Sequence, residues 1–275
     1  RQTIPAGKLG MGTNYRDNCI AERINMGITL FTNNAFSSVS DPDEYSPGFD
    51  TTSLRRAEIF TYTGIGKNLM PGEGGPTVVG TPTFITDSPF VQFSNNANVA
   101  HLSLGINDSA QQTWFLLFDP NNDSTQRIIA GSFSGAAAVT PPGVSVIVDE
   151  AGALAAMQGI HYTDNDTYGT ARATLSAFNK TKPMLLCLTL DGQTTRLTDM
   201  TNNVSASLTL AAGRERAPAP LRIGKGGVTY WGSTSATSRL GAYMVFDRVL
   251  SDAEKSTVHD YLLSCIQAKF PTIIF

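Results

Sequence analysis

Charged residues are scarce in this chain of 275 residues. Asp, Glu, Lys and Arg make up 16% of it, against about 25% in an average globular protein. The net charge is −3 and no segment carries a stripe of Lys and Arg, so the footprint of a nucleic-acid-binding protein is missing. No run approaches the ~18–20 apolar residues that a membrane-spanning helix needs. We therefore expect neither nucleic acid as a partner nor insertion into a membrane.

Cysteine and histidine are also few, with three residues of each. The cysteines lie far apart and form no Cys-x-x-Cys pair, so nothing indicates a disulfide framework or a zinc site. Cys187 lies in an apolar segment and Cys265 on the apolar side of a predicted helix. We expect both to be buried free thiols, in a chain that folds in a reducing cytoplasm even if it later works outside a cell.

No catalytic motif is recognisable. A retaining glycosidase needs two carboxylates about 5 Å apart, but the close acidic pairs all fall in turn-like sequence: Asp41/Asp43, Asp149/Glu150 and Asp164/Asp166. The segment Gly131-Ser-Phe-Ser-Gly135 has Phe where a nucleophile elbow requires Ser. The three histidines are too scattered to nominate a general base. We expect a protein that is not an enzyme, and an enzyme without a familiar motif is the third alternative.

The residues that are plentiful indicate β-structure. Thr, Ser, Asn and Gly take the place of charge, and from Thr77 onward short apolar runs recur between Gly, Pro, Asn and Asp. This pattern is typical of an all-β protein. Residues 1–75 are less regular and are predicted to form an N-terminal arm with irregular strands, which could serve for attachment. Because the chain begins with Arg rather than Met, we expect processing or a larger parent protein.

The segment 239–262 predicts a strand followed by a helix. Leu240, Ala242, Met244 and Phe246 are expected on one face of the strand, and the intervening residues on the other. Ser251 and Glu254 have the spacing of a capping box. Helical spacing then places the apolar residues of 258–265 on one face, which we expect to pack against a sheet.

This closing element, with its Asp-Arg-x-Leu-Ser-x-x-Glu corner at 247–254, resembles that of laminin-G-like domains of the concanavalin A-like superfamily. The Trp-bearing segment 112–118, the Asp191-Gly192 hairpin and the Leu-x-Ile-Gly stretch at 221–224 resemble the same family in order and spacing. The resemblance covers roughly residues 75–268. It implies a two-sheet antiparallel β-sandwich (a jelly roll) over residues 76–275, with a short C-terminal helix, and it points to binding.

Two aromatic segments are the predicted ligand-binding residues. The segment 161–168 carries Tyr162, Asp164, Asp166 and Tyr168, and a Gly- and Ser-rich segment before the last strand carries Tyr230 and Trp231. Exposed aromatic rings flanked by Asp and Asn can stack on sugar rings and hold their hydroxyl groups. The alternative is that these rings seal the sandwich edge or a subunit contact. Trp114, within an apolar strand, is expected in the core.

A calcium ion is a weaker expectation. Asp119, Asn121 and Asp123 place oxygen side chains at alternate positions, as calcium loops do, although no carboxylate follows at the twelfth position. The family resemblance implies a rim calcium in several relatives, which makes Asp119 and Asp123 the candidate ligands. The alternative is a hairpin turn held by Asx hydrogen bonds.

These observations favour a non-catalytic recognition module that binds surface carbohydrate or a host receptor, as part of a bacteriophage virion appendage or decoration. The alternative is a purely structural virion component of the capsid, tail or fibre. Both predict homo-oligomers and contacts with other virion subunits. The apolar segment Phe270–Phe275 is expected to dock on a neighbour. The expected location is the virion, made in the host cytoplasm, or alternatively the extracellular space.

Overall fold

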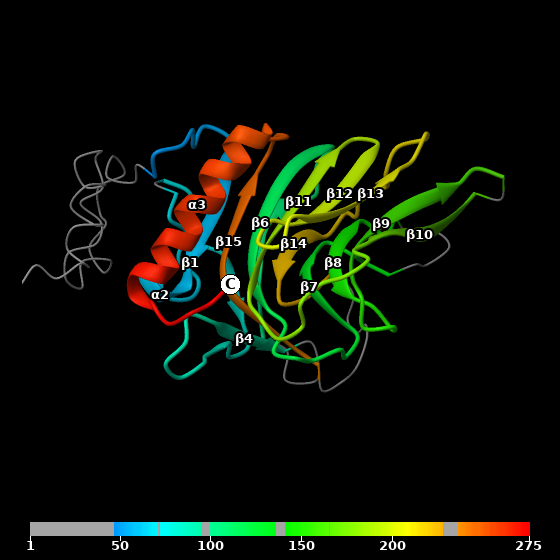
Figure 1. Ribbon diagram of the computed structural model, residues 1–275. Coiled ribbons are helices and arrows are strands. Elements are labelled where there is room, and N and C mark those ends of the chain that lie inside the picture. The colour runs from blue at the N-terminus through cyan, green and yellow to red at the C-terminus, as the bar shows by residue number, and fades with distance from the viewer. Residues whose placement is uncertain (1–46, 71, 95–99, 136–140, 165, 228–235) are drawn as a thin grey trace, which may run out of the picture.

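Two antiparallel β-sheets lie face to face in the computed structural model (Figure 1). The structure describes residues 47–70, 72–94, 100–135, 141–164, 166–227 and 236–275. The path of the eight-stranded sheet is β13 (Val204–Thr209), β12 (Thr194–Asp199), β11 (Met184–Asp191), β6 (Gln111–Asp119), β15 (Thr237–Phe246), β4 (Val91–Ser94), β3 (Thr83–Phe84). β1 (Leu54–Ile59) pairs with β15 beside this path.

The second sheet has seven strands. Their order is β10 (Thr167–Thr174), β9 (Leu154–Tyr162), β8 (Val144–Val148), β7 (Arg127–Gly131), β14 (Pro220–Ile223), β5 (His101–Asn107), β2 (Thr77–Val79). Every recorded strand pair is antiparallel, for example β9 with β10 and β6 with β15. The predicted fold, an all-β two-sheet antiparallel sandwich with a C-terminal helix, is confirmed.

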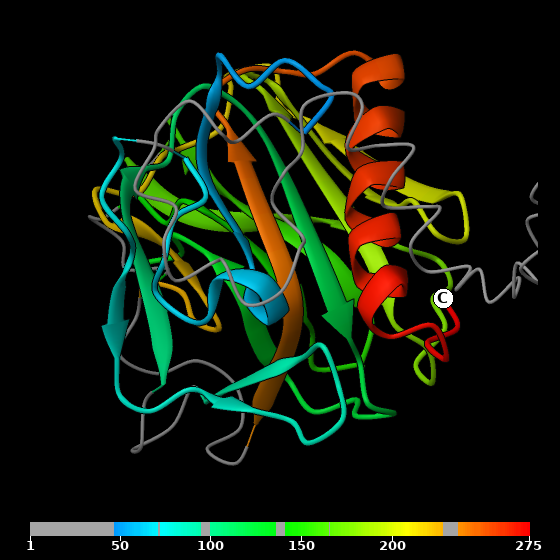
Figure 2. The ribbon, with the colours of Figure 1, turned by 90° about the vertical axis from the view of Figure 1, so that its left-hand side faces the viewer.

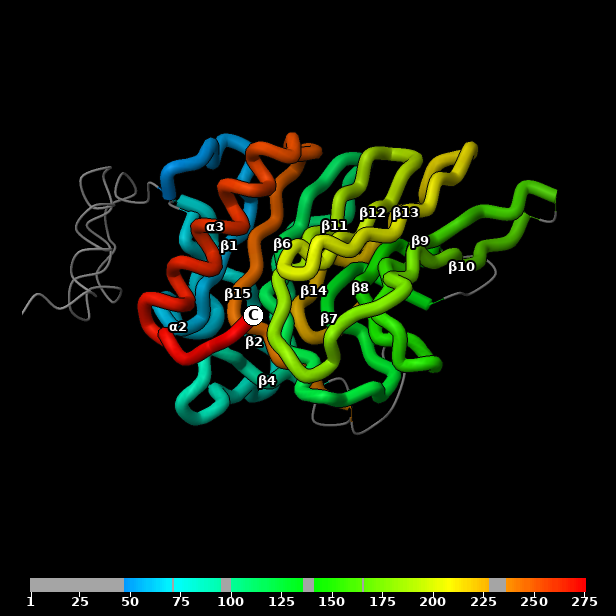
Figure 3. The backbone as a smooth tube through the Cα atoms, viewed as in Figure 1, coloured from blue at the N-terminus to red at the C-terminus, as the bar shows by residue number. Residues whose placement is uncertain are grey.

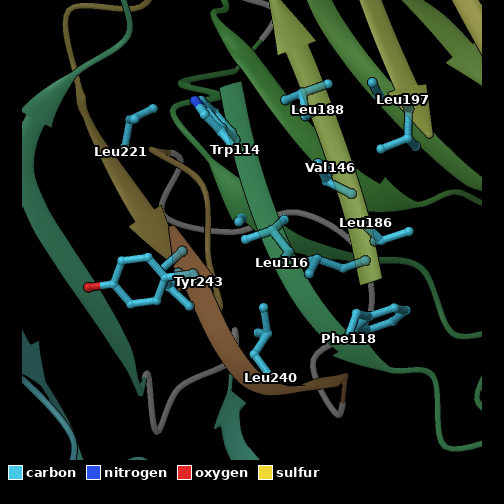
Figure 4. Packing of buried hydrophobic residues seen from close by; sticks show 14 of the residues in the cluster. Trp114, Leu116, Phe118, Val146, Leu186, Leu188, Leu197, Leu221, Leu240 and Tyr243 are labelled. Atoms are coloured by element: carbon cyan, nitrogen blue, oxygen red, sulfur yellow. The ribbon is translucent and has the colours of Figure 1, made fainter. Parts of the chain in front are cut away.

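The main core fills the space between the sheets. Alternate residues of each strand point inward because side chains in a strand alternate between its two faces. Figure 4 shows Trp114 and Leu116 of β6 and Leu186 of β11 in the same cluster as Val146 of β8 and Leu221 of β14. Trp114 is 2% exposed, which confirms its predicted place in the core.

The outer face of the eight-stranded sheet is covered by the helix α3 (Asp252–Lys269), as Figure 2 shows. Val258, Tyr261 and Leu262 of the helix pack with Phe115 and Met244 of the sheet. The predicted capping box is present, because the Ser251 side chain accepts from the Glu254 amide while the Glu254 carboxylate accepts from the Ser251 amide. The helix therefore forms a third layer on the outer face of the eight-stranded sheet. Within the described ranges, no helix combines the length and apolarity needed to cross a bilayer.

The predicted facing of β15 is wrong at one residue. Ala242, Met244 and Phe246 face the helix as expected, but Leu240 lies in the inner core with Tyr243. A β-bulge between Leu240 and Ala242 in the pairing with β6 shifts the alternation by one residue.

Both ends of the described chain pack on the sandwich. β1 and the short helix α2 (Phe60–Thr63) lie within the range assigned to an N-terminal arm, yet β1 is a strand of the sheet. In the C-terminal tail, Ile273 and Phe275 are partly buried against the cluster between α3 and the sheet, whereas Ile274 is 69% exposed. Docking of this tail on a neighbour stays a prediction.

Candidate ligand-binding site

The β9–β10 hairpin carries one of the two predicted aromatic segments. Figure 3 shows this hairpin at the side of the molecule opposite α3. β9 is buried from Leu154 to Gly159, and its last three residues become half-buried and then exposed. Residues 161–168, predicted as one segment, consist of two strand ends and a turn. Strand alternation therefore decides which side chains meet.

One face of the hairpin tip holds a stacked pair of rings. His161 and Tyr168 are opposite one another in the register, with ring centroids 4.7 Å apart and an interplanar angle of 24°. His161 Nε2 lies 2.9 Å from Oδ1 of the exposed Asp166. Asp166 has a φ of 51°, a left-handed conformation that Asp tolerates better than most residues. The turn thus brings a carboxylate to the edge of the ring pair.

Tyr162 lies on the other face. It is opposite Thr167 in the register, and the residue is 49% exposed. The ring lies over Gly169, where an added Cβ would meet the Tyr162 Cε2 atom at 2.5 Å. Glycine at this position therefore lets the ring approach the backbone this closely. Asp164 is exposed in the turn between the strands.

The structure thus brings four predicted residues to one hairpin tip but divides their rings between two faces. Tyr168 and Asp166 form one group, and Tyr162 belongs to the opposite side. The residue missing from the predicted set is His161, which completes the ring pair. The feature of the sequence that could have revealed His161 is the alternation of a strand that continues through residue 161. Tyr230 and Trp231 lie outside the described residues, so their role stays a prediction.

The predicted calcium ligands each face an arginine. Asp119 lies 3.5 Å from the Arg239 guanidinium, and Asp123 lies 3.2 Å from that of the buried Arg127. Asp119 also accepts from the Asn121 amide, and Asp123 from the Thr125 amide, as in the alternative of Asx-stabilised turns. A calcium ion here would compete with two guanidinium groups, and the assignment stays a prediction. No group of three or more His, Cys, Asp or Glu side chains that could hold a metal occurs in the described part of the chain.

The hairpin tip offers groups that can bind a ligand. A ring pair and a single exposed ring provide apolar faces, while Asp164 and Asp166 provide hydrogen-bond acceptors. Such surfaces suit a polar ligand with apolar faces.

Of the comparisons with known proteins, only the one with solved structures found matches. No protein-family model matches the sequence, and no curated protein matches it. Among solved structures, the receptor binding domain of botulinum neurotoxin D is similar with a TM-score of 0.50 and 11% identity, over 78% of this chain and 54% of that one. The binding domain of botulinum neurotoxin DC in complex with SialylT has a TM-score of 0.50 and 8% identity, over 77% and 52%.

This chain therefore spans about half the length of those neurotoxin structures. Identities of this size show a common fold and nothing finer. The class that the fold defines is a β-sandwich of the kind found in these binding domains.

Proposed function

We propose that this chain is a non-catalytic recognition module that binds surface carbohydrate through the tip of the β9–β10 hairpin. The observation that carries the proposal is the stacked His161–Tyr168 pair with Asp166 at its edge, on a projecting hairpin. The two neurotoxin structures are named as binding domains, one of them in complex with SialylT. Their fold supports the proposal by analogy.

The chemistry of sugars explains why this tip suits them. A pyranose ring presents a face of C–H groups that packs on an aromatic ring, and a rim of hydroxyl groups that need acceptors. Tyr168 can supply the ring and Asp166 an acceptor on one face. On the other face, Tyr162 and Asp164 offer a second contact. A glycan that wraps the hairpin tip could touch both.

The test is a glycan array, followed by titration of the best ligand in solution. Tyr168→Ala and Tyr162→Ala should each weaken binding about tenfold or more, equivalent to ~1.4 kcal/mol. Gly169→Ala should displace the Tyr162 ring and weaken binding while leaving the hairpin folded. Phe84→Ala is the matched control, since Phe84 is also 49% exposed but lies on β3. Full binding by both tyrosine variants would place the ligand elsewhere.

The second candidate function, a structural virion component, is favoured by the exposed apolar edge of the sandwich. Val79 on β2 and Phe84 on β3 are among the exposed large apolar residues. Within the described residues, β2 ends the seven-stranded sheet and β3 ends the other. Edge strands with apolar side chains are ready partners for another chain.

We propose the virion surface as the location for either function, with the extracellular space as the alternative. Assembly is tested by the mass of the protein in solution. Phe84→Lys and Val79→Lys should dissociate an oligomer built on this edge, while Ile274→Lys, an exposed residue of the C-terminal tail, should not. A wild-type protein that stays monomeric at high concentration would count against the structural role.

A further inference from the structure

Three basic side chains gather around the β5–β14 pair of the seven-stranded sheet. Arg222 of β14 is opposite Ser103 of β5, and His101 lies two residues before Ser103. Because side chains alternate along a strand, Arg222 and His101 share the outer face of the sheet. The intervening residues Leu102 and Ile223 lie in the inner core. Lys225 lies two residues after the end of β14 at Ile223.

This basic cluster (His101, Arg222 and Lys225) is unusually buried for its charge. His101 and Lys225 are each only 7% exposed, and Arg222 is half-buried. Lysine is almost never buried unless it is paired. Yet none of the three forms an ion pair with a carboxylate of the described residues. The Arg222 guanidinium is thus half-buried without a counter-charge, an arrangement that costs free energy.

Buried nitrogen atoms without hydrogen-bond partners also indicate that the cluster binds an anion. Arg222 Nη1 donates to the Gly226 carbonyl at 2.7 Å, but Arg222 Nε is buried without a partner. His101 Nδ1 is also buried and without a hydrogen bond. Buried polar groups are normally satisfied, and exceptions call for an explanation such as an absent ion.

Burial and the neighbouring positive charges both disfavour the protonated forms of these groups. Burial, together with the positive charges of Arg222 and Lys225, lowers the pKa of His101 to about 4. Burial and the Arg222 charge also lower the pKa of Lys225. A negative charge placed among the three side chains would oppose both shifts.

We infer that the basic cluster is a binding site for an oxyanion, a sulfate or phosphate group, held by Arg222 and Lys225 with His101 beside them. Arg offers forked donors and Lys a compact charge, the pair of groups by which proteins hold such anions. The site is separate from the hairpin tip, because β8 and β7 lie between β9 and β14 in the sheet. The proposed anion site can therefore be tested independently of the proposed glycan site.

The first test is thermal unfolding with sodium sulfate or phosphate at millimolar concentration, against chloride at equal ionic strength. Both anions should raise the melting temperature of the wild type. Lys225→Gln should abolish that rise and should itself melt higher in chloride, since it removes uncompensated repulsion. Lys182→Gln, at an exposed lysine, is the matched control and should respond like the wild type. A Lys225→Gln protein that keeps the full anion response would overturn the inference.

The second test follows the histidine ring signals by NMR, and it needs no variant. The chain has three histidines, one in the basic cluster, one at the hairpin tip and one on α3. Sulfate should shift the His101 signals in a saturable way and leave His161 and His259 unchanged. An unmoved His101 would contradict the site. A glycan bound at the hairpin should instead shift His161, so the two proposals fail separately.

The source of the anion is resolved by comparing inorganic sulfate with a monosaccharide sulfate ester and its unsulfated sugar. Tighter binding of the ester indicates a sulfated or phosphorylated glycan, and tighter binding of the free ion indicates the inorganic anion. Both results support the site. Binding of the unsulfated sugar with the same His101 shift would show that the charge is irrelevant, and would refute it.

Discussion

At the scale of the residue, the most unusual group is the Glu58 carboxyl. It is fully buried on β1, opposite the equally buried Tyr243. The nearby Arg56 is engaged elsewhere, with the Leu104 carbonyl and Glu73. Burial raises the pKa of Glu58 to about 9, outweighing the nearby amides of Lys67 and Gly66 and the Tyr243 hydroxyl. Glu58 is therefore protonated in the folded protein at neutral pH.

This predicts a stability that falls as pH rises. Between about 4.5, the pKa of an ordinary Glu, and about 9, the folded state keeps a proton that the unfolded state has lost, so alkali favours unfolding. His101 acts at lower pH, between about 4 and 6.5. Denaturant titrations from pH 7 to 8 thus lie above the range of His101 and below the range in which the Cys187 thiol, whose pKa burial raises to about 11, contributes. Glu58→Gln should remove a decline of roughly 1 kcal/mol per pH unit. Glu150→Gln, at an exposed carboxylate, should retain it, and an equal slope in all three proteins would refute the assignment.

A buried ion pair connects two loops at one rim of the sandwich. Both nitrogens of the Arg214 fork contact Asp108, at 2.6 and 2.9 Å, and both side chains are buried. Arg214 also donates to the Ser109 carbonyl. The pair joins the segment after β5 to the loop after β13. Its geometry is that of a bidentate, fully desolvated contact.

Removing one partner of this pair should destabilise strongly. Asp108→Asn leaves the Arg214 charge buried without its counter-ion, a loss of about 3–5 kcal/mol. The double variant Asp108→Leu/Arg214→Met should recover much of it, because neither group is then unpaired. Urea unfolding measures the stability of both variants. The control is Glu150→Gln, which breaks the exposed ion pair with Arg172 and should cost under about 1 kcal/mol. A single variant no worse than this control would show that the pair contributes little.

The candidate site shows what a sequence can predict about single residues. Tyr162 and Tyr168 could be selected from composition alone, because two tyrosines flank acids and amides in a polar stretch. Their division between two faces could not, since it depends on strands that continue through 161 and 168. The inclusion of His161 depends on the same register. The basic cluster could not be predicted from the sequence either, because His101 and Arg222 are 121 residues apart in the chain and come together only through strand pairing.

At the scale of the element, the terminal helix was the most predictable. Its start is encoded locally by Ser251 and Glu254, and its buried side follows from helical spacing. Ser251→Ala should cost about 1 kcal/mol, the usual value for a lost N-cap. Thermal unfolding should show it, and Ser251→Asn or Ser251→Asp should restore most of the loss. Ser264→Ala, near the other end of α3, tests whether any serine of the helix gives the same effect. An equal loss there would remove the special role of the cap.

The bulge in β15 marks where local reasoning fails at this scale. Alternation of apolar residues predicted one uninterrupted strand, because each residue from 240 to 246 is compatible with a buried position. The shift arises from pairing with β6, and Gly241 fits there because an added Cβ would lie 2.7 Å from Leu117. A bulge depends on the partner strand, so the sequence of β15 alone does not reveal it.

At the scale of the whole molecule, the recurring apolar runs and the family resemblance were enough to predict the fold class but not the order of the strands. In the eight-stranded sheet the neighbours β6 and β15 come from distant parts of the chain, and in the other sheet β14 lies between β7 and β5. These pairings are long-range, and sequence patterns of individual strands say nothing about them. The sequence left open whether β1 belongs to the sandwich for the same reason, since the partner of β1 is the last strand.

The layered arrangement predicts how stability is distributed. β6, β11 and β15 lie at the centre of their sheet, with the inner core on one side and the α3 cluster on the other. The tip of the β9–β10 hairpin has few buried side chains. Amides of the central strands should therefore exchange hydrogen only through global unfolding, whereas those near 160–168 should exchange through local opening. Hydrogen-exchange mass spectrometry measures both.

A bound glycan should slow exchange at the tip, and the Tyr168→Ala variant provides the comparison at the same glycan concentration. Sulfate should instead protect the segment around 222–227. Protection by the glycan of the central strands alone would indicate a ligand site away from the hairpin.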